Sequence, residues 1–228
     1  MRRARALRAL SSVLIVAGVL LLADAGVTLV WQEPLSALYA RIHQDRLAGQ
    51  LGDLRSLTAL QLRALARLRT ERRRIAFLAR ALQRRVATGH ALGRIRIKRM
   101  GIDFVIVQGT DPGDLREGPG HYPTTPLPGL RGTVAIAGHR TTYLAPFRDL
   151  DKVRHGDLIV VTMPYGRFTY RAERQLIVSP DAYDYVTATR RYDRLALTAC
   201  HPLYSASRRI VVFARLVSVQ ALGRARVA

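Results

Sequence analysis

The chain contains a single cysteine, Cys200, among its 228 residues. One cysteine excludes an intrachain disulfide and any metal cluster held by several thiolates. Lysine is almost as scarce: Lys98 and Lys152 are the only two, so 35 of the 37 basic residues are arginine. The patterns GxxxxGKS/T, GxGxxG and HExxH are also missing, which leaves nucleotide-binding and zinc-protease functions without a motif. We therefore expect neither a cofactor nor a metal.

Acidic residues are few as well. The chain has 16 Asp and Glu against 37 Lys and Arg, a net charge of +21. Dispersed arginines can neutralise nucleic-acid phosphates, but no zinc-finger cysteine pair and no alternation of basic and aromatic residues accompanies them here. A negatively charged cell envelope or lipid surface explains the charge at least as well. We therefore expect no nucleic-acid partner.

One long apolar run lies near the amino terminus. Residues 12–31 carry a single charge, Asp24, and would form about 30 Å of helix, enough to cross a bilayer. Residues 1–11 form a basic tail, so the positive-inside rule leaves the amino terminus in the cytoplasm and the body outside, with Trp31 at the outer interface. The alternative is a signal peptide cleaved near Ala23-Asp24-Ala25, which also exports the body.

Residues 32–92 are predicted to form a helical stalk. The segment 35–89 lacks proline, and its leucines recur mainly at helical spacing with arginines between them. The favoured interpretation is a solvated linker helix. Self-association and contact with the anionic membrane surface are the alternatives.

The period changes from 3.6 to 2 after the stalk, which indicates an all-β body at 93–218, followed by a carboxyl-terminal tail at 219–228. Short strands separated by turn signals are typical of a barrel or sandwich. Eight strands are predicted, at 94–98, 102–108, 133–137, 158–163, 167–172, 175–179, 194–199 and 209–217.

Three residues at strand ends are candidates for chemistry. Cys200 ends a strand, where a nucleophile is held rigidly yet faces a cleft, although an inert buried thiol is the plain alternative. His139 follows another strand and could exchange protons with a thiol. Arg209 opens the next strand, where a guanidinium could polarise a carbonyl.

Segments 135–143 (AIAGHRTTY) and 197–200 (LTAC), with Arg209 ahead of an apolar strand, resemble the sortases, membrane-anchored cysteine transpeptidases of Gram-positive bacteria. Segments 118–123 (GPGHYP) and 139–143 (HRTTY) look most like class E, the housekeeping-type sortases of actinobacteria. Ala199 departs from the threonine or other small residue that commonly precedes the cysteine.

The resemblance implies an eight-stranded sortase-type barrel and a role for each candidate. Cys200 would form a thioester with the threonine of an LAxTG or LPxTG sorting signal, His139 would move protons, and Arg209 would bind the oxyanion. The implied partners are secreted proteins with such a signal, a peptidoglycan precursor or other amine, and the lipid bilayer. Tyr122, Tyr143, Thr198 and Ala199 are substrate-groove candidates, with packing at the barrel rim as the alternative for the two tyrosines.

Several alternatives remain open at this point. His121 and His201 are other possible bases, and Arg208 could replace Arg209. A pilus-polymerising sortase would carry an Asp-Pro-aromatic lid, which nothing before residue 93 matches. From another class, a basic envelope-binding protein would need none of the three catalytic candidates.

Overall fold

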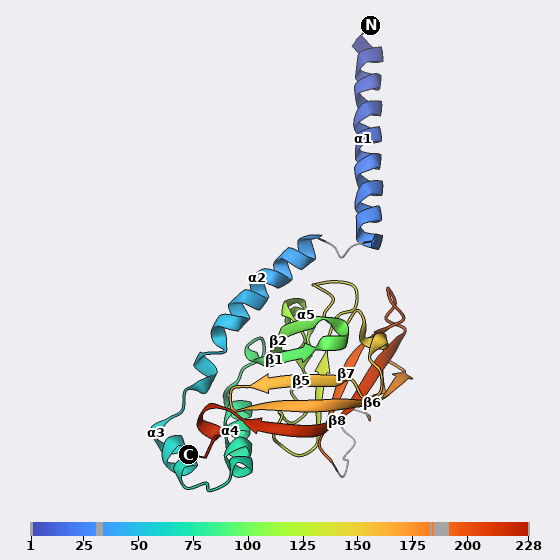
Figure 1. Ribbon diagram of the computed structural model, residues 1–228. Coiled ribbons are helices and arrows are strands. Elements are labelled where there is room, and N and C mark those ends of the chain that lie inside the picture. Colours follow the sequence, from blue (N-terminus) through green and yellow to red (C-terminus); the bar gives the residue numbers. More distant parts are fainter. Residues whose placement is uncertain (1, 31–33, 183, 185–191, 228) are drawn as a thin grey trace.

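The computed structural model describes residues 2–30, 34–182, 184 and 192–227 (Figure 1). Helix α1 (Arg2–Val30) projects away from the rest of the molecule. The sequence predicts a membrane anchor at 12–31, but no helix among the described residues has both the length and the apolar character that a membrane crossing requires. Trp31, expected at the outer interface, lies outside the described residues.

The described strands form one closed barrel, in the order β1-β2-β3-β4-β7-β8-β6-β5. Their bounds are β1 (Ala91–Ile97), β2 (Ile102–Gln108), β3 (Gly120–His121), β4 (Thr133–Ala137), β5 (Leu158–Met163), β6 (Gly166–Val178), β7 (Arg194–His201) and β8 (Arg208–Ala221). The pairs β2–β3 and β4–β7 are parallel and the other neighbours antiparallel. The expected eight-stranded barrel is thus confirmed.

The strand count agrees with the sequence although two strands differ. The segments 167–172 and 175–179 are wrong as separate strands, because they are the two halves of β6, which continues through an irregularity between Ala172 and Arg174. The sequence does not predict β3, since two residues in a Gly/Pro-rich segment show no alternation. Two predicted strands are therefore one strand in the structure, and one strand of the structure was not predicted, so the total of eight is the same.

The interpretation of 32–92 as a solvated stalk is wrong for its described helices, α2 (Pro34–Gln50), α3 (Ala59–Ala66) and α4 (Glu71–Arg85). The apolar stripe of α4 enters the main core of the barrel with Ile75, Leu78, Ala79 and Leu82. A helical stripe looks the same in sequence whether it meets water or a barrel, so only the packing distinguishes the two. The segment forms separate helices, and Thr58 and Thr70 cap the amino termini of α3 and α4.

Helix α2 packs along β2 and the short helix α5 (Pro112–Glu117). The side-chain amide of Gln44 accepts a hydrogen bond from the N–H of Val105 at 2.7 Å and donates one to its carbonyl at 3.0 Å. Gln44 also donates to the carbonyl of Glu117 at 2.8 Å. It therefore satisfies the backbone of β2 as a neighbouring strand would, and it fixes α2 against the body.

Alternation along β7 separates two environments. Leu195, Leu197 and Ala199 belong to the main core. Ala196 instead packs with residues of β4 and β8 in a second, smaller cluster on the opposite face of the sheet. Cys200 follows the series of Ala196, so its side chain belongs to the face that is turned away from the main core.

Candidate active site

Three neighbouring strands bring the candidate catalytic residues to one end of the barrel. In the antiparallel pair β7–β8, Cys200 lies opposite Arg209. Strand β4 runs parallel to β7, and just past its end the N–H of Gly138 donates to the carbonyl of Thr198 at 3.0 Å. His139 therefore leaves β4 at the level of Cys200, one strand away.

The register distinguishes the two candidate arginines. Directly opposed residues of an antiparallel pair share a face, so Arg209 shares the face of Cys200, whereas Arg208 opposes His201 on the other face. Nη1 of Arg209 donates to the carbonyls of Ala206 at 2.9 Å and Arg208 at 3.0 Å. The loop before β8 thus holds the guanidinium of Arg209, a half-buried residue, while Arg208 is exposed.

His139 is held by close packing of the residue before it. A Cβ on Gly138 would lie 2.7 Å from the ring of Phe147, so only glycine permits this approach. The Nε2 atom of His139 is buried and has no hydrogen-bond partner among the described residues. Burial, and then the charge of Arg116, lower the pKa of His139 below its ordinary value of 6.5. Both influences favour the neutral imidazole, and Nε2 is left for a substrate or the thiol.

Tyr143 lies beside this histidine, with ring centroids 5.4 Å apart. On other sides it meets Tyr39 of α2, at 6.1 Å in an edge-on arrangement, and the guanidinium of Arg116 of α5, at 5.9 Å. The backbone N–H of Tyr143 donates to the Ser36 hydroxyl at 3.4 Å. Apart from His139, the sequence predicts none of the residues around this tyrosine ring at the site. Tyr39 and Arg116 come from segments whose position depends on tertiary packing, and no local signal marks them.

The other groove candidates are placed differently. Tyr122 and Thr198 contact each other, with their hydroxyl oxygens 3.0 Å apart, and Thr198 is 1% exposed. Ala199 is 4% exposed and lies in the main core. Its methyl group therefore does not reach the face that carries Cys200.

Neither alternative histidine is placed as a base for the thiol. His121 is 1% exposed, and its ring nitrogens lie 2.9 Å from Gln108 Oε1, 3.1 Å from Thr125 Oγ1 and 3.3 Å from the carbonyl of Pro126. Burial lowers the pKa of His121 to about 4. His201 lies on the face opposite Cys200. No group of three or more His, Cys, Asp or Glu residues in the described ranges could hold a metal ion.

Residues 95–217, more than half of the chain, match the sortase domain. The chain belongs to the sortase family. It is 32% identical over 134 residues to sortase D of Bacillus subtilis (strain 168), a match that covers 58% of this chain and 66% of that protein, just under two thirds of its length. Sortases are cysteine transpeptidases, which agrees with the chemistry that the three side chains suggest.

Two solved sortase structures share the fold. Sortase E from Streptomyces avermitilis is 32% identical with a TM-score of 0.55, covering 59% of this chain and 93% of that one. The SrtF sortase from Corynebacterium diphtheriae is 28% identical with a TM-score of 0.58, covering 60% and 90%. The expected likeness to class E is therefore present, but it is shared with sortase D and SrtF.

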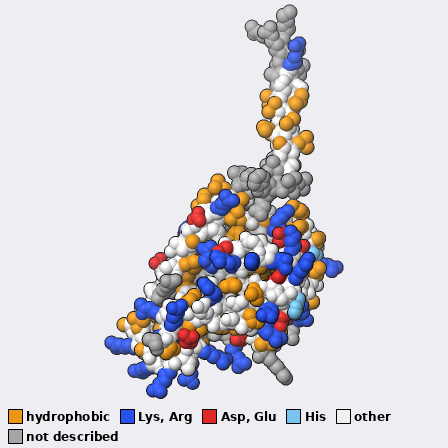
Figure 2. All heavy atoms as spheres, viewed as in Figure 1, with side chains coloured by type: hydrophobic (Ala, Val, Ile, Leu, Met, Phe, Trp, Pro, Cys, Tyr) orange, Lys and Arg blue, Asp and Glu red, His pale blue; other side chains and the backbone are white. Residues whose placement is uncertain are grey.

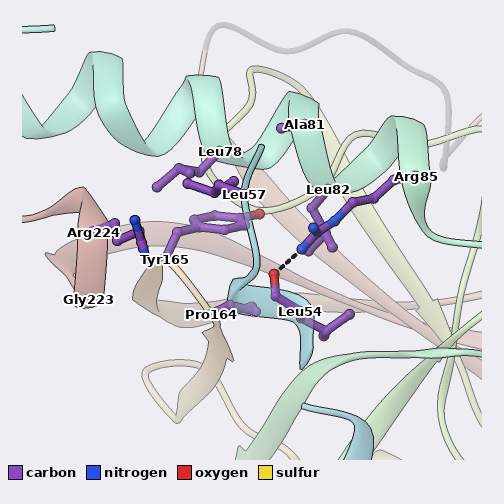
Figure 3. Close-up of a pocket in the computed structure, with 10 residues that line it drawn as sticks. All are labelled: Leu54, Leu57, Leu78, Ala81, Leu82, Arg85, Pro164, Tyr165, Gly223 and Arg224. Carbon is purple, nitrogen blue, oxygen red and sulfur yellow. Dashed lines mark hydrogen bonds between the residues drawn. The ribbon is translucent and has the colours of Figure 1, made fainter. Parts of the chain in front are cut away.

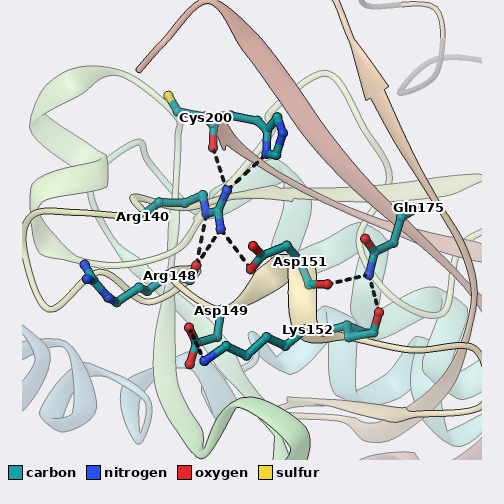
Figure 4. A network of polar contacts seen from close by, with 9 residues as sticks. Arg140, Arg148, Asp149, Asp151, Lys152, Gln175 and Cys200 are labelled. Atoms are coloured by element: carbon teal, nitrogen blue, oxygen red, sulfur yellow. Dashed lines mark hydrogen bonds and ion pairs between the residues drawn. The ribbon is translucent and has the colours of Figure 1, made fainter. Parts of the chain in front are cut away.

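A buried arginine beside the site has no role in the sequence prediction. The Arg140 side chain, 2% exposed, pairs with Asp151 at 2.9 Å and donates to the carbonyls of Arg148 and Cys200 (Figure 4). Figure 4 shows the Cys200 carbonyl turned toward this guanidinium and the thiol turned away. Because arginine is usually exposed, its place directly after His139 in the sequence gives no hint of burial.

An apolar pocket lies elsewhere, between α4 and the turn that joins β5 to β6 (Figure 3). Leu57, Leu78 and Tyr165 are among its lining residues. This turn adjoins the end of β8, where Gly166 opposes Ala221, whereas Cys200 faces the start of that strand. The pocket is thus separate from the sortase site.

Proposed function

We propose that this sortase cleaves the Thr–Gly bond of a carboxyl-terminal LAxTG or LPxTG sorting signal and joins the threonine carbonyl to a cell-wall amine. The observation that carries the proposal is the register that sets Arg209 opposite Cys200, with His139 at the same level after the adjacent strand. Secreted proteins would supply the signal. A peptidoglycan precursor or another amine would accept the acyl group.

In the first half-reaction, His139 takes the thiol proton of Cys200, and the thiolate attacks the threonine carbonyl carbon. The bond to glycine breaks, and His139 returns the proton to the departing amine, which leaves a thioester on Cys200. In the second half-reaction the acceptor amine attacks the thioester carbonyl and gives a proton to His139, which passes it to the departing thiolate. Atoms and protons balance over the two halves.

The electrostatics of the site support these roles. A base must begin neutral, and both burial and the nearby Arg116 favour the neutral form of His139 by lowering its pKa. A tetrahedral intermediate places negative charge on the carbonyl oxygen, which Arg209 is proposed to stabilise by charge-assisted hydrogen bonds. Nε2 of His139 has no hydrogen-bond partner in the described part of the chain, which agrees with a group that finds its partner during the reaction.

Mass spectrometry of the full-length chain in detergent, incubated with LAxTG and LPxTG peptides and candidate amines, tests the proposal. We expect an adduct with the mass of the amino-terminal peptide fragment on Cys200, a transfer product, and neither in Cys200→Ala. Cleavage by Cys200→Ala would refute the thioester mechanism. Preference between the two peptides decides the signal, for which the class E likeness favours LAxTG.

The choice of acceptor in this experiment, together with an alkylation assay, separates the alternative functions. A pilus-polymerising sortase would use a lysine side chain of a protein subunit as the acceptor. A non-catalytic envelope-binding protein would give no thioester, and alkylation of Cys200 would leave its binding to cell walls unchanged.

We also propose that residues 12–31 hold the catalytic body at the outer face of the cell membrane. The large apolar side chains that helix α1 exposes between Val13 and Leu22 are 57% to 75% exposed (Figure 2). Exposed apolar area of this extent favours transfer to an apolar phase. Retention of the chain in membranes after alkaline carbonate extraction supports this location, and release into the supernatant contradicts it.

A further inference from the structure

The proposed mechanism does not use Arg140, although this residue lies between two of its parts. A buried guanidinium is costly unless it is paired and hydrogen-bonded. Here all three guanidinium nitrogens have partners. Nε and Nη2 donate to the carbonyl of Arg148 at 3.0 and 2.8 Å, and Nη2 also pairs with Asp151 at 2.9 Å. These contacts fix one edge of the guanidinium to the segment that follows the histidine loop.

The remaining nitrogen reaches the strand that carries the nucleophile. Nη1 donates to the carbonyl of Cys200 at 3.4 Å and lies 3.3 Å from Nδ1 of His201 (Figure 4). Because Arg140 directly follows His139, a single side chain links the base, the end of its loop and the backbone of the nucleophile.

The loop between these contacts needs such a restraint. Tyr143, Leu144 and Ala145 have positive φ angles of 52°, 63° and 39°. Residues other than glycine rarely adopt this backbone conformation, and it persists only where the surrounding structure imposes it. The N–H of Phe147 donates to the carbonyl of His139 at 2.9 Å. Together with the Arg140–Arg148 bonds, this contact closes the loop at its base.

We propose that Arg140 is a positioning residue that holds His139 and Cys200 at the spacing required for proton transfer. The inference rests on the proposed function, because it concerns the same pair of residues. Arg140 acts through His139 and the Cys200 backbone and does not touch the thiol.

A double-mutant cycle on thiol reactivity tests this role without a peptide substrate. The rate of Cys200 alkylation by iodoacetamide is measured at pH 7 in the full-length wild type, His139→Gln, Arg140→Gln and the double variant. If Arg140 acts through His139, Arg140→Gln slows alkylation in the wild type and has no further effect after His139→Gln. Effects that multiply, or normal alkylation of Arg140→Gln, would overturn the proposal. So would an unchanged rate in His139→Gln.

Turnover gives a second readout. A misplacement of about 1 Å can cost about 10²-fold in rate, so we expect kcat of Arg140→Gln to fall by about that factor. KM should stay within about twofold, because Arg140 holds catalytic groups and not the signal peptide. Arg140→Lys should recover only part of kcat, since an ammonium lacks the planar fork. An equal loss from both variants, or a loss confined to KM, would contradict positioning.

Two further variants separate positioning from general damage. Lys152→Gln is the matched control, because Lys152 pairs with Asp149 at 3.1 Å on the same segment without contacting Arg140, and it should be silent. If a thermal melt shows that Arg140→Gln is unfolded, Asp151→Asn replaces it in the cycle, since it removes the ion pair and leaves the Arg148 bonds. If the wild type transfers no peptide, the proposed function fails, and the alkylation cycle still decides the role of Arg140.

Discussion

Replacement of Arg209 is the most direct test of how the oxyanion is held. Arg209 lies opposite Cys200 in the pair β7–β8, so the two side chains leave the same face of the sheet. Both of its hydrogen bonds to described residues come from Nη1, so Nε and Nη2 remain for a substrate carbonyl. Arg208, one residue earlier, carries the same charge on the opposite face and is the matched control.

The expected loss of kcat/KM follows from the number of hydrogen-bond donors that each Arg209 variant lacks. Loss of one oxyanion donor typically costs about 10²–10³ in rate, or about 2.7–4 kcal/mol. Arg209→Ala should therefore lower kcat/KM by at least about 10², because both free donors disappear. Arg209→Lys keeps the charge but lacks the fork and cannot keep the two loop bonds and the substrate bonds together, so it should recover only part. Arg208→Ala should be nearly silent.

The assay is the initial rate of transfer from a sorting-signal peptide to an amine, measured as kcat/KM for the three variants and the wild type. If Arg208→Ala has a low kcat/KM and Arg209→Ala a normal one, the register of β8 does not determine which arginine binds the oxyanion. Near-normal rates in all three would assign the oxyanion to backbone N–H groups instead.

Three other predictions follow from the packing. Gly138→Ala should lower the unfolding free energy by about 1–3 kcal/mol and reduce kcat, because its Cβ collides with Phe147; an unchanged Tm and kcat would contradict this. Arg116→Gln should raise the pKa of His139, as charge repulsion is lost while burial remains, and move the acid limb of the pH–rate profile upward; an unmoved limb refutes it. His121 binds no proton in the fold until the pH nears its pKa of about 4, whereas the unfolded chain takes one near 6.5. Stability should therefore fall by about 3 kcal/mol as the pH drops from 7 to 4, and urea unfolding of His121→Asn with the same pH dependence as the wild type would refute this.

The sequence predicts those parts of the fold that depend on local patterns. The strands 102–108, 133–137 and 158–163 coincide with β2, β4 and β5, because alternation and turn residues suffice to define them. The order in which the strands pair is another matter. The parallel pairing of β4 with β7 sets His139 beside the strand of Cys200, the proposed nucleophile, and joins segments 61 residues apart. Alternation along each strand does not reveal which strands pair.

The burial of the Arg140 guanidinium could not be predicted from the local sequence, for a different reason. Arg140 looks like any other arginine in a chain that has 35 of them, and only the convergence of Arg148, Asp151 and Cys200 around it makes burial tolerable. In the same way, the stripe of α4 fits a solvated helix or a packed one equally well. The burial of Arg140 and that of the α4 stripe both depend on surfaces that exist only after the barrel forms.

The packing also extends the catalytic unit beyond the segment 95–217 that matches the sortase domain. Ser36 and Tyr39 of α2 contact Tyr143, which lies against His139, while α4 completes the core on which the barrel rests. The helical segment is thus neither a spacer nor a solvated stalk, because α2 contacts the tyrosine beside His139 and α4 packs into the main core. It follows that the surroundings of His139, the proposed base, are set jointly by the barrel and by residues that precede it in the chain, so the candidate site is described completely only when α2 is included.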